Sequence, residues 1–229
     1  MTLVITAAQQ KGGSGKTSLV AHLSIVWASP QRVEFSRNRP GVKVVCLDLD
    51  PQQSLKTWFE ARNEAGHDIS NLDVRTIREE MLSESIERAR SEADIVMIDL
   101  PPGMQGASFA GYAAANIVLV PLQLSPLDLW ATGPTLKAIR DAGTKPLVVI
   151  NRAPAHARLG DFVIAQAKNA GWPVAHTCLG NRIAFAASLV AGRGITEESG
   201  ASIAAAEMRL LAREVLNAAR SDAEEPQAA

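Results

Sequence analysis

The sequence predicts an α/β fold: a single doubly wound domain with a mostly parallel central sheet and helices on both faces. Short apolar runs alternate with helix-length stretches along almost all of the 229 residues. Several runs are continuous Val, Ile and Leu without polar alternation, which is typical of parallel strands covered on both faces. Apolar residues make up 47% of the chain, which is enough for a sizeable core. The regular alternation favours right-handed crossovers within one sheet.

The expected strands are the short apolar runs, taken here in chain order. They are Leu3–Ala7, Val42–Leu47, Val74–Ile77, Ile95–Ile98, Ile117–Val120, Leu147–Ile150 and Val174–Cys178. The expected helices are the longer stretches Lys16–Ala28, Gln52–Ala65, Ser83–Glu92, Pro126–Ala142, Leu159–Ala170, Ile183–Ala191 and Ala201–Arg220. In the last of them Ile203, Met208, Leu211 and Leu216 recur near helical spacing.

Two segments interrupt the alternation, and both are expected to lie on the surface. Ser29–Gly41 (SPQRVEFSRNRPG) is a long basic connection, which a solvated surface loop explains best. Residues 221–229 (SDAEEPQAA) are acidic and polar, and we expect them to form a disordered tail. The predicted domain therefore spans residues 1–220.

The composition narrows the possible classes of protein. Lys and Arg number 23 against 24 Asp and Glu, so the formal charge of −1 excludes a uniformly basic protein but allows a local basic patch. Cys46 and Cys178 are too few for a disulfide framework or a four-cysteine metal site. No run approaches 18 apolar residues, and the first residues lack the basic region of a signal peptide. We therefore expect a cytoplasmic protein.

The segment KGGSGKT, residues 11–17, follows the first expected strand directly and opens the first expected helix. Glycines there allow a tight turn, so that backbone N–H groups converge on phosphate oxygens at the positive end of a helix. Lys16 would reach the β- and γ-phosphates, and the Thr17 hydroxyl would bind Mg²⁺. Gln10 stands where the general pattern has its first glycine. The expected nucleotide-binding residues here are Lys11, Gly12, Gly13, Ser14, Gly15, Lys16, Thr17 and Ser18.

Carboxylates follow two of the expected strands. Asp48 and Asp50 end the second strand, and Asp99 ends the fourth. A parallel sheet brings the carboxyl ends of its strands to one edge, where doubly wound folds bind ligands. A lone Asp after a strand is often only a helix N-cap, but three carboxylates in this order behind a phosphate loop favour a site for Mg²⁺.

Residues 11–17 resemble the deviant Walker A motif of the ParA/MinD family of P-loop ATPases, which has an early lysine at the position of Lys11. Asp48–Ser54 looks like that family's switch I, Asp99–Gly103 looks like its Walker B motif and switch II, and Val120–Gly133 is close to the segment after its fifth strand. The resemblance covers most of the chain and implies a P-loop NTPase that uses ATP and Mg²⁺. The sequence begins close to the phosphate loop, without room for an N-terminal helix-turn-helix, so it looks like the small ParA class.

The resemblance also implies roles for the residues of the site. The expected catalytic residues are Lys11, Lys16 and Asp50, and the expected metal ligands are Thr17, Asp48 and Asp99. Lys11 would reach across a dimer interface to the partner's nucleotide, and Asp50 would orient or activate the attacking water. Asn151 ends the sixth expected strand, where family members often contact the adenine, although a turn-forming asparagine explains it equally well.

By the same resemblance, the protein would hydrolyse ATP to ADP and phosphate and act as a switch. An ATP-bound C₂ homodimer would bind DNA nonspecifically, associate with the nucleoid and partition plasmid or chromosomal DNA, and a ParB-like or other cargo adaptor would stimulate hydrolysis. The candidate DNA contacts are Arg182, Arg193, Arg209, Arg213 and Arg220, which on a dimer could form a basic stripe. A solvated helix face is an equal explanation, since Glu207 and Glu214 share the last helix.

Three other functions compete with DNA partition. A relative could position a protein cargo, such as a chemotaxis cluster or a carboxysome, and nothing in the sequence separates the two cargoes. Membrane cycling of the MinD type is disfavoured, because the acidic end of the sequence would be repelled by anionic lipid. A metabolic or redox enzyme on this scaffold lacks an evident substrate constellation, a cysteine cluster or histidines at metal-ligand spacing.

Overall fold

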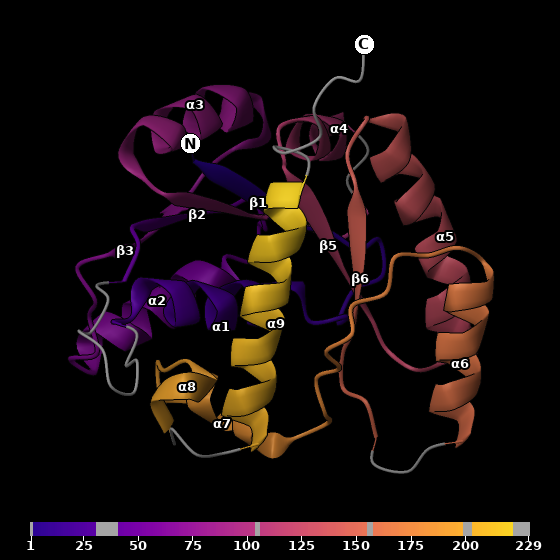
Figure 1. The fold of residues 1–229 in the computed structure, drawn as a ribbon. Helices are drawn as coiled ribbons and strands as arrows, with labels where there is room; N and C mark the ends of the chain where they lie inside the picture. The colour runs from indigo at the N-terminus through magenta and orange to yellow at the C-terminus, as the bar shows by residue number, and fades with distance from the viewer. Residues whose placement is uncertain (1, 31–40, 104–105, 155–157, 199–202, 222–229) are drawn as a thin grey trace.

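Six parallel strands form one open sheet in the order β3-β2-β4-β1-β5-β6 (Figure 1). The computed structural model describes residues 2–30, 41–103, 106–154, 158–198 and 203–221. The strands are β1 (Leu3–Ala7), β2 (Val44–Asp48), β3 (Leu72–Thr76), β4 (Ile95–Asp99), β5 (Ile117–Leu122) and β6 (Pro146–Ile150). Every residue is buried in all of these strands except the edge strand β3. The predicted doubly wound α/β fold is confirmed.

Helices cover both faces of this sheet. They are α1 (Lys16–Ala28), α2 (Ser54–Glu64), the short 3₁₀ helix η1 (Glu79–Met81), α3 (Leu82–Glu92), α4 (Gly106–Ala113), α5 (Pro126–Asp141), α6 (Arg158–Asn169), α7 (Ile183–Val190), α8 (Ile195–Glu198) and α9 (Ile203–Arg220). Figure 1 shows α9 running along the sheet next to α1, while α5 and α6 lie beyond β5 and β6. The first and last long helices therefore share one face.

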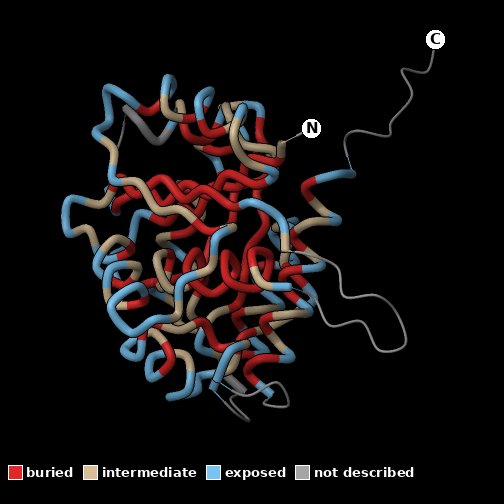
Figure 2. Tube along the Cα trace, turned by 90° about the vertical axis from the view of Figure 1, so that its left-hand side faces the viewer, coloured by how far each residue is buried: buried red, intermediate tan, exposed pale blue. Residues whose placement is uncertain are grey.

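Each face of the sheet has its own hydrophobic cluster. Leu23 of α1 and Met208 of α9 belong to one cluster, together with Met97 of β4. Ile86 of α3 and Ile139 of α5 belong to the other. Successive strand residues point to opposite faces, so apolar residues are needed at every strand position. Figure 2 shows the result as buried chain in the interior beneath exposed loops.

The seventh expected strand, Val174–Cys178, is wrong. The segment runs beside β6 but makes only a single isolated bridge, between Val174 and Val148. The N–H groups of His176 and Thr177 donate instead to the carboxylate of Glu214 on α9, at 2.6 and 3.0 Å. The N–H groups of Ala175 and Leu179 donate to carbonyls of β6, but those of His176 and Thr177 between them go to a side chain of α9, which interrupts the ladder.

Other expectations were incomplete or lie outside the described residues. Helices α4 and α8 were not expected, and α4 (GASFAGYA) has two glycines, which weaken a helical prediction. Most of the Ser29–Gly41 connection (31–40) and of the expected tail (222–229) lies outside the described residues. The division into a domain of residues 1–220 and a disordered tail therefore stays a prediction.

A buried arginine joins α2 to α8. Arg62 is 1% exposed, and its two terminal nitrogens each donate to a Glu197 carboxylate oxygen at 2.8 Å. Nη1 also donates to the carbonyl of Gly192 at 3.1 Å. The N–H of Gly194 donates to the same carboxylate at 2.7 Å. Glu197 therefore compensates the arginine charge and holds the chain that leads into α8.

Replacing Glu197 by alanine is expected to lower the free energy of unfolding by about 3 kcal/mol, because Arg62 would stay buried without its counter-charge. Urea denaturation followed by circular dichroism measures this change. Glu198→Ala is the control, since Glu198 lies 3.6 Å from Arg193 in a partly exposed pair, and should cost less than about 1 kcal/mol. Equal losses in the two variants would contradict this account.

Candidate functional site

The phosphate loop connects the end of β1 to the beginning of α1. Gly13 and Gly15 have φ values of 73° and 97°, in the left-handed region that glycine tolerates. A Cβ on Gly15 would also collide with the side-chain amide of Asn151. No described side chain caps α1, so the first N–H groups of the helix are available to an anion.

Lys16 points into the site from the first turn of α1. The residue is 6% exposed, and its Nζ donates to the carbonyl of Gln9 at 3.2 Å. Burial lowers the pKa of this ammonium group, while the negative charges of Asp99 and Asp50 act in the opposite direction. The lysine is thus held in place with its charge only partly compensated.

Asp99 is the most unusual group of the site. It is 1% exposed, and neither carboxylate oxygen has a hydrogen-bond partner of normal geometry among the described residues. Burial raises the pKa of Asp99 to about 7; the nearby Thr17 hydroxyl and Lys16 oppose this rise, and Asp48 adds to it. A buried carboxylate whose oxygens lack hydrogen-bond partners, next to a hydroxyl, offers the oxygen ligands that Mg²⁺ prefers.

Asp48 and Asp50 have different environments from Asp99. Asp48 accepts the N–H groups of Asp50 at 2.9 Å and of Lys56 at 3.2 Å, and burial raises its pKa. Asp50 lies in the wall of a cavity beside the phosphate loop. Within the described residues, no three His, Cys, Asp or Glu side chains gather closely enough to hold a metal by themselves. Any Mg²⁺ there would also need hydroxyl, phosphate or water oxygens.

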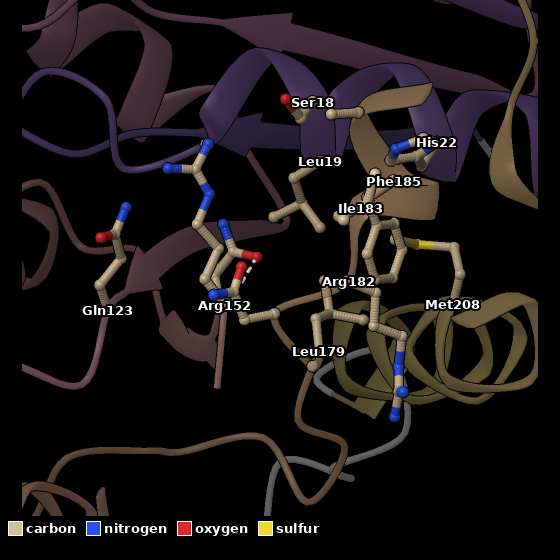
Figure 3. Close-up of a pocket in the computed structure, with 15 residues that line it drawn as sticks. Ser18, Leu19, His22, Gln123, Arg152, Leu179, Arg182, Ile183, Phe185 and Met208 are labelled. Atoms are coloured by element: carbon tan, nitrogen blue, oxygen red, sulfur yellow. Dashed lines mark hydrogen bonds between the residues drawn. The ribbon is translucent and has the colours of Figure 1, made fainter. Parts of the chain in front are cut away.

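Two cavities adjoin the phosphate loop. The smaller one, about 400 Å³, is lined by the loop glycines, Lys16, Thr17 and Asp50. The larger one, about 800 Å³, lies between α1 and residues 179–186 (Figure 3). Leu19 and Phe185 give it an apolar wall. One cavity thus has charged groups suited to phosphates, and the other has the apolar surface that a base and sugar require.

Lys11 is held within its own chain. Its Nζ lies 2.8 Å from Oδ1 of Asp128 on α5, and the side chains are 43% and 7% exposed. The Ser125 hydroxyl also donates to the Asp128 carboxylate, at the N-terminus of α5. The structure therefore gives Lys11 an intramolecular partner, which the sequence did not indicate.

Asn151 contacts the phosphate loop directly. Its Nδ2 donates to the Ser14 carbonyl at 2.8 Å, and its Oδ1 accepts the N–H of Arg152 at 3.0 Å. Both residues line the larger cavity, and Arg152 was not among the expected site residues. Gln123 was missed as well; its Nε2 donates to the Gly13 carbonyl at 2.9 Å. Their place just after β5 and β6, at the ligand-binding edge, is the signal that could have found them.

The five arginines expected to contact DNA have different environments. Arg182 forms a close ion pair with Glu207, at 2.6 Å. Arg193 donates to His67, and Arg209 donates to the carbonyl of Thr196. Arg213 and Arg220 are exposed on α9. Three of the five candidates are thus engaged by contacts within the chain.

The chain has relatives among known ATPases. No protein-family model matches the sequence. Maintenance of carboxysome distribution protein A of Halothiobacillus neapolitanus is 25% identical over 196 residues, covering 82% of this chain and 84% of the relative. Chromosome-partitioning ATPase Soj of Thermus thermophilus is 25% identical over 245 aligned residues, covering 93% of this chain and 94% of the relative. The chain is a homologue of the ParA/MinD/Soj-type ATPases.

Solved structures share the fold. The septum site-determining protein MinD of Pyrococcus horikoshii, complexed with Mg-ADP, has a TM-score of 0.72 at 18% identity and covers 98% of this chain and 100% of its own. Cobyrinic acid a,c-diamide synthase of Mycobacterium smegmatis, with a bound ATP analogue and magnesium, has a TM-score of 0.71 at 22% identity and covers 99% and 98%. Among the described helices of this chain, none is both long and apolar enough to span a membrane.

His22 forms part of the larger cavity and is buried against the C-terminal segment. It is 2% exposed, and its Nδ1 accepts the N–H of Ile195 at 3.1 Å. Burial lowers its pKa from 6.5 to about 4, and the backbone of Phe185 opposes this shift. The imidazole is therefore neutral at pH 7, with its proton on Nε2.

The lowered pKa of His22 predicts a loss of stability in acid. Between about pH 6.5 and 4 the unfolded chain binds a proton that the folded chain excludes, so the contribution is complete above pH 6.5 and falls by up to about 3 kcal/mol towards pH 4. Thermal or urea unfolding at several pH values measures this slope. His22→Asn, which keeps an acceptor for the Ile195 N–H, should reduce the slope. An unchanged pH dependence in that variant would contradict the assignment.

Proposed function

We propose that the protein is a Mg-ATP-dependent ATPase switch of ParA type, which dimerises with ATP and in that state binds DNA nonspecifically to partition plasmid or chromosomal DNA. The observation that carries the proposal is the buried Asp99 carboxylate beside Lys16 and Thr17, with both oxygens unmatched. A glycine-rich loop with open helix N–H groups adjoins it. This combination suits a phosphate chain with its Mg²⁺, and the homologous ATPases support hydrolysis.

In this proposal the groups of the chain bind the nucleotide and orient the water. Lys16 and the backbone N–H groups of the loop would hold phosphate oxygens, and Thr17 and Asp99 would hold Mg²⁺. Bound Mg²⁺ would neutralise charge on the β- and γ-phosphates. Asp50, in the wall of the phosphate-side cavity, would orient the attacking water. Asp48 is engaged by backbone N–H groups and would serve the metal through water.

Dimerisation would require Lys11 to change partner. Asp128 compensates its charge in the single chain. A triphosphate presented by a second copy would compete for the same ammonium group, and it carries more negative charge. Nucleotide binding and dimerisation would then favour each other, as linkage requires.

Lys11→Ala is expected to abolish the ATP-dependent dimer and to keep nucleotide binding by the monomer, because Lys11 is not the lysine at the start of α1. Analytical ultracentrifugation with ATP, combined with a nucleotide-binding assay, separates the two effects. Lys137→Ala is the control, since this exposed lysine pairs with Asp141 on α5. An ATP dimer of normal strength in Lys11→Ala would exclude the cross-interface role.

DNA binding would use the exposed arginines of α9. Arg213 and Arg220 are seven residues apart, so they share one face of the helix. In a dimer two such faces would double the basic surface, which the net charge of −1 does not prevent. The other three candidates are held by contacts within the chain and would contribute less.

Purified protein is expected to bind nonspecific duplex DNA with ATP, and not with ADP or without nucleotide, with an affinity that falls steeply with salt. Arg213→Gln/Arg220→Gln should weaken this binding and lower the salt slope by roughly one for each phosphate that the variant no longer neutralises. Fluorescence anisotropy over a salt series measures both. Arg78→Gln/Arg88→Gln removes two exposed charges near and within α3 and serves as the control. No DNA binding by wild type in any nucleotide state would reject DNA partition.

Positioning of a protein cargo is the second candidate, because two relatives are named for carboxysome distribution. The nucleotide site would work in the same way, and the difference would lie in the adaptor that stimulates hydrolysis. A DNA-binding adaptor would indicate partition, and an adaptor that belongs to a protein assembly would indicate cargo positioning. A metabolic ATP-dependent enzyme on this fold is the third and weaker candidate, since the likeness to the Mycobacterium smegmatis synthase concerns the fold alone.

A further inference from the structure

Arg152 lies where the two cavities of the site meet. It lines both the phosphate-side cavity with Lys16 and the larger cavity with Leu19. In Figure 3 its side chain extends towards the beginning of α1. Within the described residues, no hydrogen-bonded or ionic partner of its guanidinium is found. A cationic group thus reaches the boundary between the two cavities without a counter-charge.

The backbone around Arg152 fixes this position. The residue has a φ of 54°, a left-handed conformation that is uncommon for a residue with a side chain. Its N–H donates to Oδ1 of Asn151, and Nδ2 of Asn151 donates to the Ser14 carbonyl. The first hydrogen bond fixes the backbone of the strained turn, and the second ties that turn to the phosphate loop. Strain that is held in this way at a cavity points to a role in the site.

The other cations near the cavities are already engaged. Lys11 pairs with Asp128, and Arg182 pairs with Glu207. Lys16 lies close to the negative charges of Asp99 and Asp50. A bound nucleoside triphosphate would bring more negative charge than Lys16 alone can balance.

We propose that Arg152 binds the α-phosphate of the nucleotide, and this inference rests on the proposed function. The smaller cavity suits the terminal phosphates and their metal, because Lys16, Thr17 and Asp50 line it. The larger cavity suits the nucleoside, because its wall is apolar. The group that crosses between them is the α-phosphate. The planar guanidinium can donate two parallel hydrogen bonds to it, which an ammonium group cannot do.

The test is Arg152→Asn, because asparagine tolerates left-handed backbone and removes the charge. Adenosine, AMP, ADP and ATP are each used to displace a fluorescent ATP analogue from wild type and variant. We expect about tenfold weaker binding of AMP, ADP and ATP, and an unchanged affinity for adenosine. Arg152→Lys should recover part of the loss, since it restores the charge but not the planar fork.

Other outcomes would overturn the inference. An equal loss for all four ligands would indicate contact with the base or sugar, and a loss confined to ATP would place Arg152 at the terminal phosphates. Arg182→Asn is the comparison, because Arg182 lines the same cavity but is held by Glu207. Equal losses of nucleotide affinity in both arginine variants would mean that the effect comes from the lower positive charge of the cavity and not from a contact of Arg152 with the α-phosphate. Wild type that binds no nucleotide would instead reject the proposed function, and the inference with it.

Discussion

Two buried carboxylates stand side by side at the carboxyl edge of the sheet, and the site is organised around this concentration of negative charge. Asp48 and Asp99 are paired in register as the last residues of β2 and β4, and Ala7 at the end of β1 is the other neighbour of Asp99. Because β1 lies next to β4 in the sheet, the phosphate loop that follows β1 and its Lys16 lie close to these carboxylates. Neither carboxylate oxygen of Asp99 has a hydrogen-bond partner of normal geometry among the described residues. A bound cation would therefore compensate the negative charge of this buried group.

The phosphate loop is held from several sides before any ligand is present. Gln9 donates to the Thr132 hydroxyl of α5 at 2.9 Å, while Gln123 and Asn151 donate to loop carbonyls. These amides come from the ends of β1, β5 and β6, so the sheet itself fixes the loop. A loop fixed in this way loses little conformational entropy on binding phosphate.

The sequence predicted local features well, but it predicted contacts between residues far apart in the chain poorly. Continuous apolar runs identified six strands, because burial on both faces imposes that pattern. The run at Val174–Cys178 has the same pattern, but its N–H groups are taken by Glu214, which lies far along the chain. In the same way, the motif located Lys11 in the loop, and nothing near it in sequence indicated its pairing with Asp128. The place of Arg152 just after β6 could have indicated a site residue, but its left-handed backbone conformation carries no sequence signal.

The contact between Arg62 and the chain at Gly192 has a mechanical consequence. A side chain at position 192 would collide with the Arg62 backbone, so α2 and the turn after α7 lie in direct contact. Helix α2 begins four residues after Asp50. Any shift of α2 must therefore carry α8 with it or separate Arg62 from Glu197, which costs several kcal/mol. The helix that begins beside Asp50 is therefore coupled to α8 through the Arg62–Glu197 pair.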